Sequence, residues 1–185
     1  MVAELQNKRV IAFVDGQNLF NAAKQAFGYD YPNYDAVKLA QLVCEKRGQA
    51  LGERWTLVKL HFYTGMPSPT KDEPRNRFWK SKLGAMGMKK PLVQTFSRPL
   101  VYRNGIGQEK GIDVRLALDA VRLAHENEYD VALIFSQDQD FRAYQELIWT
   151  EVLEFCNLSL LDIERLFHGG ILWRNPIPLI YANRY

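Results

Sequence analysis

Two short apolar runs constrain the fold of this 185-residue chain more than any other feature. The first is VIAFV at 10–14 and the second is VALIF at 131–135. Neither run alternates apolar with polar residues, which is typical of strands buried on both faces in a parallel sheet with helices on each side. Each run ends abruptly at a polar residue, Asp15 after the first and Ser136 after the second.

Helix and strand patterns alternate along the rest of the chain. Further strands are expected at 55–63 and 91–96, and a hairpin or loop at 98–107. This alternation predicts an α/β protein, a three-layer α/β/α sandwich around a central, mostly parallel sheet. We find no repeat and no linker, so one domain is expected over 1–185. The other expected elements are helices at 18–26, 35–47, 73–86 and 113–126, of which the first three end at Gly28, Gly48 and Gly87, and an edge strand at 177–181.

The net charge of +3 is an average over two unlike regions. Residues 71–110 hold ten Lys or Arg against three acids, whereas 126–164 hold ten acids against one base, Arg142. A basic region favours a polyanionic partner, and concentrated carboxylates favour either a metal site or simple solubility. The hydrophobic content of 47% suffices for a core and excludes a disordered or collagen-like chain.

Neither a membrane segment nor a secretory signal is visible. No apolar stretch approaches the roughly 20 residues that a membrane helix needs, and polar residues interrupt the N-terminal region. We therefore expect a soluble, cytoplasmic protein with no membrane partner. Cys44 and Cys156 lie far apart, and no Cys or His has zinc-ligand spacing, so both cysteines are expected to be buried thiols.

Acidic residues gather where the two best strands end. Asp15 follows the first strand directly, Asp138 and Asp140 follow the second, and Asp113 opens the helix before it. Ligands of open parallel sheets bind at the carboxyl ends of strands. Carboxylates that converge there repel one another unless a cation is present, and Mg²⁺ and Mn²⁺ prefer such oxygen ligands. The pattern therefore indicates a Mg²⁺ or Mn²⁺ site able to act on a phosphodiester.

Neighbouring polar residues fit such a site, although structural roles remain open. Asn18, one helical turn after Asp15, and Ser136 are placed to hold a carboxylate or phosphate oxygen. Asp15 and Asp113 are alternatively helix caps, and the later Asp pair is alternatively a solvated turn. Asp119 lies six residues after Asp113 on the expected helix, so it points elsewhere and is assigned a structural role.

Three motifs in order resemble the NYN domain family, PIN-like nuclease relatives also described as LabA-like. They are FVDGQNLFN at 13–21, EKGIDVRLALDAVRLA at 109–124 and YDVALIFSQDQDF at 129–141, with YTG at 63–65 as a supporting match. The resemblance covers roughly residues 8–149.

The resemblance implies a PIN-like α/β/α fold and a ribonuclease site that depends on Mg²⁺ or Mn²⁺. Asn18 and Lys110 match the polar and basic residues that accompany the family's acids. The third motif departs from the usual SGDSDF, because Gln137 and Gln139 replace small residues, and 150–185 does not match the family's further strand and helix. The implied catalytic and metal-binding residues are Asp15, Asp113, Asp138 and Asp140.

The helix expected at 73–86 combines basic residues with the aromatics Phe78 and Trp79. Basic side chains neutralise phosphates and aromatic rings stack on unpaired bases, so single-stranded or structured RNA is the fitting partner. The alternative is that the aromatics belong to the core and the bases form a solvated face. The candidate RNA-binding residues are Arg75, Arg77, Lys80 and Lys82.

These features predict a metal-dependent endoribonuclease, in which water activated at the metal attacks the phosphodiester without a protein nucleophile. The alternative is a non-catalytic RNA-binding or regulatory module that retains the fold. A phosphatase or nucleotide-hydrolysing enzyme has less support, because the chain lacks a GxxxxGK[ST] loop and a DxDx motif at the first strand. The aromatic stretch 29–34 forms either a homodimer surface or an internal contact.

Overall fold

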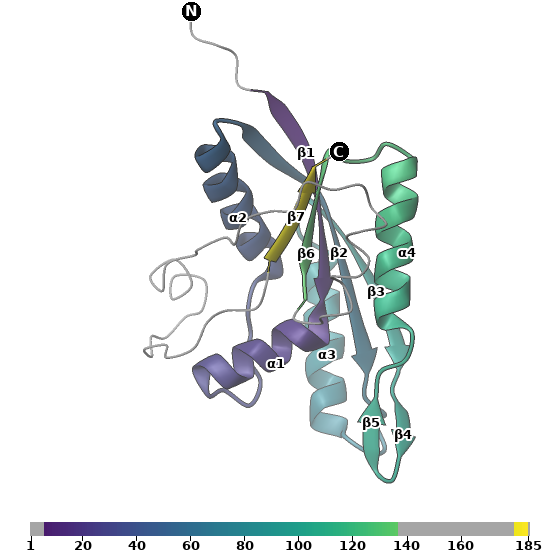
Figure 1. The fold of residues 1–185 in the computed structure, drawn as a ribbon. Helices are drawn as coiled ribbons and strands as arrows, with labels where there is room; N and C mark the ends of the chain where they lie inside the picture. The colour runs from purple at the N-terminus through teal and green to yellow at the C-terminus, as the bar shows by residue number, and fades with distance from the viewer. Residues whose placement is uncertain (1–5, 137–179, 185) are drawn as a thin grey trace, which may run out of the picture.

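A computed structural model of the chain describes residues 6–136 and 180–184. They form a five-stranded sheet in the order β3-β2-β1-β6-β7 and a separate two-stranded hairpin, β4-β5 (Figure 1). In the sheet, β3, β2, β1 and β6 run parallel, whereas β7 pairs antiparallel with β6. The strands are β1 (Asn7–Asp15), β2 (Arg54–Met66), β3 (Leu92–Pro99), β4 (Val101–Arg103), β5 (Ile106–Gln108), β6 (Val131–Phe135) and β7 (Ile180–Arg184).

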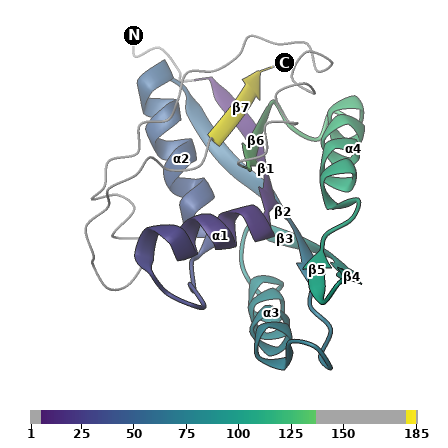
Figure 2. The same cartoon turned by 60° about the horizontal axis from the view of Figure 1, so that its bottom comes forward.

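Helices cover both faces of the sheet. Three helices share a hydrophobic cluster with one face, and α4 packs with the opposite face (Figures 1 and 2). The predicted three-layer α/β/α sandwich with a mostly parallel central sheet is therefore confirmed. The helices are α1 (Gly16–Phe27), α2 (Ala36–Leu51), α3 (Glu73–Met86) and α4 (Ile112–His125).

Strand β1 is the centre of the core and is hydrogen-bonded to β2 on one side and β6 on the other. Val10, Ala12 and Val14 pack in the cluster shared with α1, α2 and α3, whereas Ile11 and Phe13 pack in the cluster shared with α4. All five side chains are at most 1% exposed. Burial on both faces explains why β1 is apolar at every position from Val10 to Val14, as the sequence predicts.

The helix expected at 35–47 is longer than predicted, because Gly48 does not end it. Asp35 caps the start of α2, which then runs through Gly48 to Leu51. A Cβ on Gly48 would lie 2.8 Å from the Glu53 carbonyl oxygen, so this glycine allows the backbone leading into β2 to pass close to the helix. Gly48 is therefore a packing position, and the helix ends at the left-handed Gly52.

Most other elements differ from the prediction only in their bounds. Strand β2 continues to Met66 beyond the expected 55–63, and β7 takes the place of the edge strand expected at 177–181. The hairpin expected within 98–107 is β4-β5, and the Gly87 stop after α3 is confirmed.

His61 and Cys44 are both buried in the core, as predicted for Cys44. His61 is 5% exposed, and its ring stacks on Phe13 with the centroids 5.5 Å apart. Burial lowers the pKa of His61 to about 4, so the imidazole is a neutral core group at pH 7. Cys44 is a buried thiol, and Cys156 lies outside the described residues.

The contact at Gly48 predicts a measurable loss of stability. In Gly48→Ala, the added methyl group meets the Glu53 backbone, and overpacking costs about 1–3 kcal/mol of unfolding free energy. In the matched variant Gly84→Ala, on α3, the new Cβ has no atom within 4 Å, so the unfolding free energy should rise by roughly 0.5–1 kcal/mol. Urea unfolding of both variants measures the contrast, and equal effects of the same sign would contradict it.

Candidate functional site

Asp15 lies at the carboxyl end of β1, beside the ends of both neighbouring strands. It pairs with Tyr63 on β2, and Ser136 follows the last residue of β6 that pairs with β1. The chain runs from β1 outward through β2 and β3, and then returns to the other side of β1 as β6. This reversal of strand order is the place where open α/β sheets bind ligands. Asp15 is 1% exposed there.

Short polar contacts hold the Asp15 carboxylate in place. Oδ1 accepts from the backbone N–H of Asn18 at 3.0 Å, which caps α1, and Oδ2 accepts from Asn18 Nδ2 at 2.5 Å. Asn18 Nδ2 also lies 3.1 Å from Ser136 Oγ, whose hydroxyl donates to Asp15 Oδ2 at 3.4 Å. Burial raises the pKa of Asp15, and the Asn18 hydrogen bonds act against it. The capping role is confirmed, and a carboxylate with four lone-pair sites keeps capacity for another partner.

The glycine after Asp15 lets the first helix start close to the sheet. A Cβ on Gly16 would lie 2.4 Å from the Phe62 ring and 2.8 Å from the Tyr63 carbonyl oxygen. Only glycine fits this approach without displacing the β2 backbone. The Asp-Gly pair therefore places the carboxylate at the exact boundary between β1 and α1.

Glu109 is a half-buried acid at the same edge that was not predicted from the sequence. Its Oε1 accepts from the backbone N–H of Gly65, so the glycine of YTG contacts the glutamate of EKG. Burial raises the pKa of Glu109 to about 7, and the negative charges of Asp15 and Asp113 add to the effect. The motifs could have indicated this residue, because both YTG at 63–65 and EKG at 109–111 belong to the sequence pattern that resembles the NYN domain family.

Asp113 lies in the first turn of α4 and is half-buried. The alternative that Asp113 caps this helix is wrong, because the N-cap is Gly111 in a left-handed conformation and makes no side-chain cap bond. Asp113 is one of the two acids whose charge raises the pKa of Glu109. This electrostatic coupling places Asp113 in the same charge environment as Asp15 and Glu109.

Asp119 has the structural role expected for it. Its Oδ2 accepts from the Tyr63 hydroxyl at 3.1 Å and from Arg115 Nε at 2.8 Å. Burial opposes ionisation, but these two hydrogen bonds and the charges of Arg115 and Arg122 together lower the pKa of Asp119. The residue therefore joins α4 to β2.

The remaining predicted acids lie outside the described part of the chain. Asp138 and Asp140 lie within 137–179, outside the described residues. Across residues 6–136 and 180–184, no three His, Cys, Asp or Glu side chains are grouped closely enough to hold one metal ion. Of the helices in these segments, none combines the length and the apolar composition needed to cross a membrane.

The basic residues of α3 fall into different environments. Arg77 is exposed and pairs with Glu73 at 2.5 Å, and Lys80 is exposed. The Arg75 guanidinium lies 5.4 Å from the centre of the Phe20 ring, and its charge acts to lower the pKa of Glu109. Arg75 therefore faces the acidic edge, whereas the other two face solvent.

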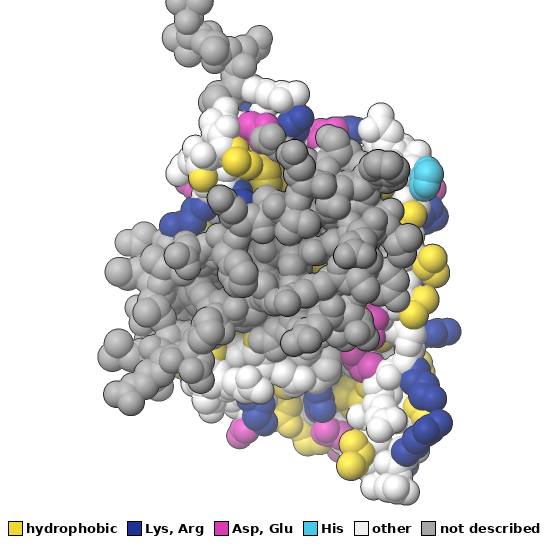
Figure 3. Space-filling view, viewed as in Figure 1, with side chains coloured by type: hydrophobic (Ala, Val, Ile, Leu, Met, Phe, Trp, Pro, Cys, Tyr) yellow, Lys and Arg dark blue, Asp and Glu magenta, His cyan; other side chains and the backbone are white. Residues whose placement is uncertain are grey.

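Lys82 and Trp79 are not on the solvated face. Trp79 is fully buried, so the alternative of a core role is confirmed for this ring. Lys82 is 7% exposed, and its Nζ donates to the Tyr34 carbonyl oxygen at 2.6 Å. Exposed basic side chains lie instead around the β4-β5 hairpin, at the lower right of Figure 3, where the exposed residues include Arg98, Arg103 and Lys110.

An α/β/α sandwich whose parallel strands end beside acidic side chains at the point of strand reversal defines a PIN-like class of protein. A model of the NYN domain matches residues 9–148, so the chain belongs to the NYN domain family. NYN domains are generally ribonucleases, and nucleases of this class usually use divalent metals. No curated protein and no solved structure gives a significant match to the chain.

The environment of Glu109 predicts a specific pH dependence of stability. Because its pKa is raised from 4.5 to about 7, the folded protein holds a proton across this interval that the unfolded chain has released. The contribution of Glu109 to the unfolding free energy therefore falls as the pH rises through the interval and is constant above it.

Glu109→Gln should remove this contribution. The stability of Glu109→Gln relative to wild type should increase between about pH 4.5 and 7 and then level off. Urea unfolding at a series of pH values measures the difference. Glu73→Gln, at an exposed acid on α3, is the control, and a Glu109→Gln difference that is constant with pH would show that the carboxyl is not perturbed.

Proposed function

We propose that this protein is an endoribonuclease that depends on Mg²⁺ or Mn²⁺. The observation that carries the proposal is the buried Asp15 carboxylate at the switch point of the parallel sheet. Its charge acts on Glu109 together with that of Asp113. Membership of the NYN domain family supports RNA as the substrate.

The acids at this edge suit a hard divalent cation. Burial raises the pKa of both Asp15 and Glu109, and the charge of Asp113 adds to the effect on Glu109. A cation would relieve this cost of placing negative charges together. The atoms available as metal ligands are carboxylate oxygens, and Mg²⁺ and Mn²⁺ prefer oxygen ligands. Because the described acids do not form a complete ligand group, we propose that Asp138 and Asp140 complete it.

In this proposal Asp15, Asp113, Asp138 and Asp140 would hold the metal, which would supply water activation and neutralise charge on the phosphodiester. Asn18 and Ser136 orient Asp15 through the bonds from Nδ2 and Oγ. Glu109 Oε1 is occupied by the Gly65 N–H, which leaves Oε2 to carry a proton. With its pKa near 7, Glu109 is suited to accept or release that proton at neutral pH.

Basic residues on two sides of the acidic edge would hold the RNA backbone. Arg75, which acts electrostatically on Glu109, is the basic residue of α3 placed to meet a phosphate near the acids. Arg77 and Lys80 extend this surface along α3, and Lys110 lies beside Glu109 in the sequence. Phosphate contacts of this kind position RNA without reading its sequence.

Removing the charge of Asp15 tests the catalytic proposal. Asp15→Asn should lower the rate of RNA cleavage in Mg²⁺ or Mn²⁺ by about a hundredfold or more, because metal catalysis contributes several kcal/mol to the transition state. It should also weaken Mn²⁺ binding measured by calorimetry. Asp30→Asn, at a side chain that is 84% exposed, is the control and should behave like wild type. Equal cleavage by both variants would contradict the proposal.

Lys80 tests the backbone-binding surface. Lys80→Ala should weaken RNA binding equally for all sequences and reduce the slope of log K against log salt by about 0.7, the value for one phosphate contact on a single strand. Lys38→Ala, at an exposed lysine on α2, should leave the slope unchanged. Fluorescence anisotropy over a salt series measures both variants, and identical slopes would remove Lys80 from the interface.

One sequence feature favours a second candidate function. Gln137 and Gln139 replace the small residues usual beside the third-motif acids, which supports a non-catalytic RNA-binding module. Salt-dependent binding that weakens in Arg75→Ala and Lys80→Ala, with RNA intact in Mg²⁺ and Mn²⁺, would favour this module and overturn the nuclease proposal.

A further inference from the structure

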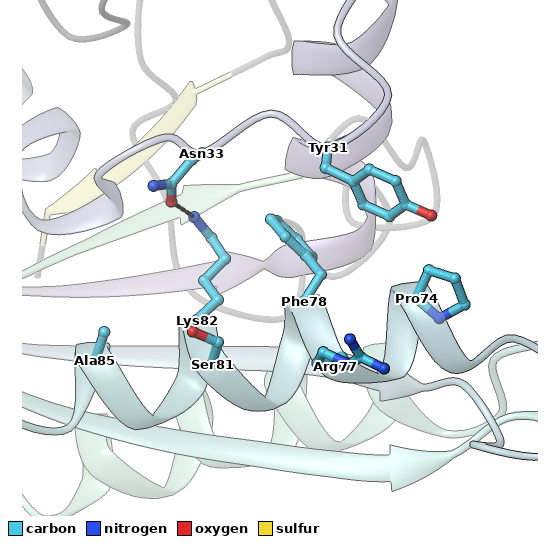
Figure 4. Close-up of a pocket in the computed structure, with 8 residues that line it drawn as sticks. All are labelled: Tyr31, Asn33, Pro74, Arg77, Phe78, Ser81, Lys82 and Ala85. Carbon is cyan, nitrogen blue, oxygen red and sulfur yellow. Dashed lines mark hydrogen bonds between the residues drawn. The ribbon is translucent and has the colours of Figure 1, made fainter.

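A cavity of about 570 Å³ lies between α3 and the segment that joins α1 to α2 (Figure 4). Its walls combine aromatic rings with hydrogen-bond donors and a cation. The residues that matter for its chemistry are Tyr31, Asn33, Arg77, Phe78, Ser81 and Lys82. Apolar walls with a few polar groups are typical of small-ligand sites.

One wall of the cavity carries an aromatic platform, the Tyr31 ring, which is supported by Phe78. The two ring centres lie 5.6 Å apart with their planes tilted by 48°, and both rings border the cavity in Figure 4. Phe78 is anchored from behind by Phe20 at 5.6 Å and by the buried Trp79 at 5.4 Å. Tyr31 is 45% exposed, so it offers ring surface to a ligand while Phe78 keeps the platform rigid.

The floor of the cavity carries a buried cation. Lys82 rises from α3 toward Asn33 in Figure 4, and its Nζ lies 3.4 Å from Asn33 Oδ1 and 2.6 Å from the Tyr34 carbonyl oxygen. Nζ also lies 3.8 Å from the centre of the Tyr34 ring. These contacts hold the ammonium in one place, and the Asn33 amide and Ser81 hydroxyl add further donors to the lining.

Tyr34 connects this cavity directly to the acidic edge. Its hydroxyl donates to the Gly16 carbonyl oxygen at 3.1 Å, one residue after Asp15, while its own carbonyl oxygen accepts from Lys82. The buried Tyr34 therefore contacts both the backbone beside Asp15 and the lysine of the cavity. At the cavity wall, Arg77 is paired with the exposed Glu73, and such a surface pair contributes little and is readily exchanged for a phosphate.

We infer that this cavity binds one unpaired nucleotide of the RNA and selects uracil or guanine, the bases with a carbonyl oxygen at position 4 of a pyrimidine or position 6 of a purine. The base stacks on the exposed Tyr31 ring, its carbonyl oxygen accepts from the Lys82 ammonium, and its phosphate meets Arg77. Cytosine and adenine present an amino group at the corresponding position, which the Lys82 ammonium does not satisfy because it has no acceptor. The inference rests on the proposed function, since it assigns a specificity site to the same RNA.

The test compares short oligouridine and oligocytidine of equal length by fluorescence anisotropy, with the wild-type chain in EDTA so that the RNA stays intact. Wild type should bind oligouridine more tightly. Tyr31→Ala should raise the Kd for oligouridine at least about fivefold, the lower end for loss of one stacked base. Asn33→Ala should reduce the preference for oligouridine over oligocytidine.

Tyr29→Ala is the matched control, because Tyr29 is 40% exposed and does not border the cavity. Its Kd for oligouridine should equal that of wild type. Since Tyr31 is also exposed, its replacement should leave the thermal midpoint nearly unchanged, which circular dichroism checks.

The outcomes separate this inference from the nuclease proposal. RNA cleavage by wild type, together with equal Kd values for Tyr31→Ala and Tyr29→Ala, overturns the nucleotide site and leaves the nuclease intact. Binding that depends on Tyr31 in a protein that does not cleave RNA supports the nucleotide site and overturns the nuclease. Equal affinity of wild type for oligouridine and oligocytidine overturns the base selection.

Discussion

The burial of β1 on both faces is the constraint on which the rest of the structure depends. Because β2 and β6 occupy both of its edges and helices cover both of its faces, the strand has no exposed side from Val10 to Val14. The residue at the carboxyl end of β1 is therefore buried away from water, even when its side chain is charged. In this chain that residue is Asp15, and its charge is supported by hydrogen bonds from Asn18 and Ser136.

Two kinds of chemistry meet at this end of the sheet and share one supporting residue. On one side, Asp15, Glu109 and Asp113 concentrate negative charge that suits a cation. On the other, α3 and the segment before α2 enclose a donor-rich aromatic cavity. Tyr34 contacts the backbone of the first region and the lysine of the second. The proposed catalytic centre and the proposed base-selecting site are thus connected through one buried residue of the core.

The sequence predicted the layers and nearly all of the elements, because apolar periodicity reports burial directly. It failed at particular residues where a distant partner decided the outcome. Gly48 is predicted to end the helix, but in the structure it lies within the helix and allows the Glu53 backbone to pass close by. The sequence pattern places Lys82 on a solvated basic face, but in the structure Lys82 is buried and its ammonium donates to Tyr34 and Asn33. Glu109 was missed because its burial depends on Gly65, 44 positions earlier in the chain.

By itself, the sequence determined that the chain is an α/β sandwich of the NYN type with Asp15 at the end of its first strand. Those features follow from local patterns and from motifs that lie within single elements. Only the tertiary structure decided that Glu109 joins the acidic edge, that Asp113 is no helix cap, and that a cavity adjoins α3. The physical reason is that burial and electrostatic coupling arise between side chains from different elements, whose proximity no local pattern records.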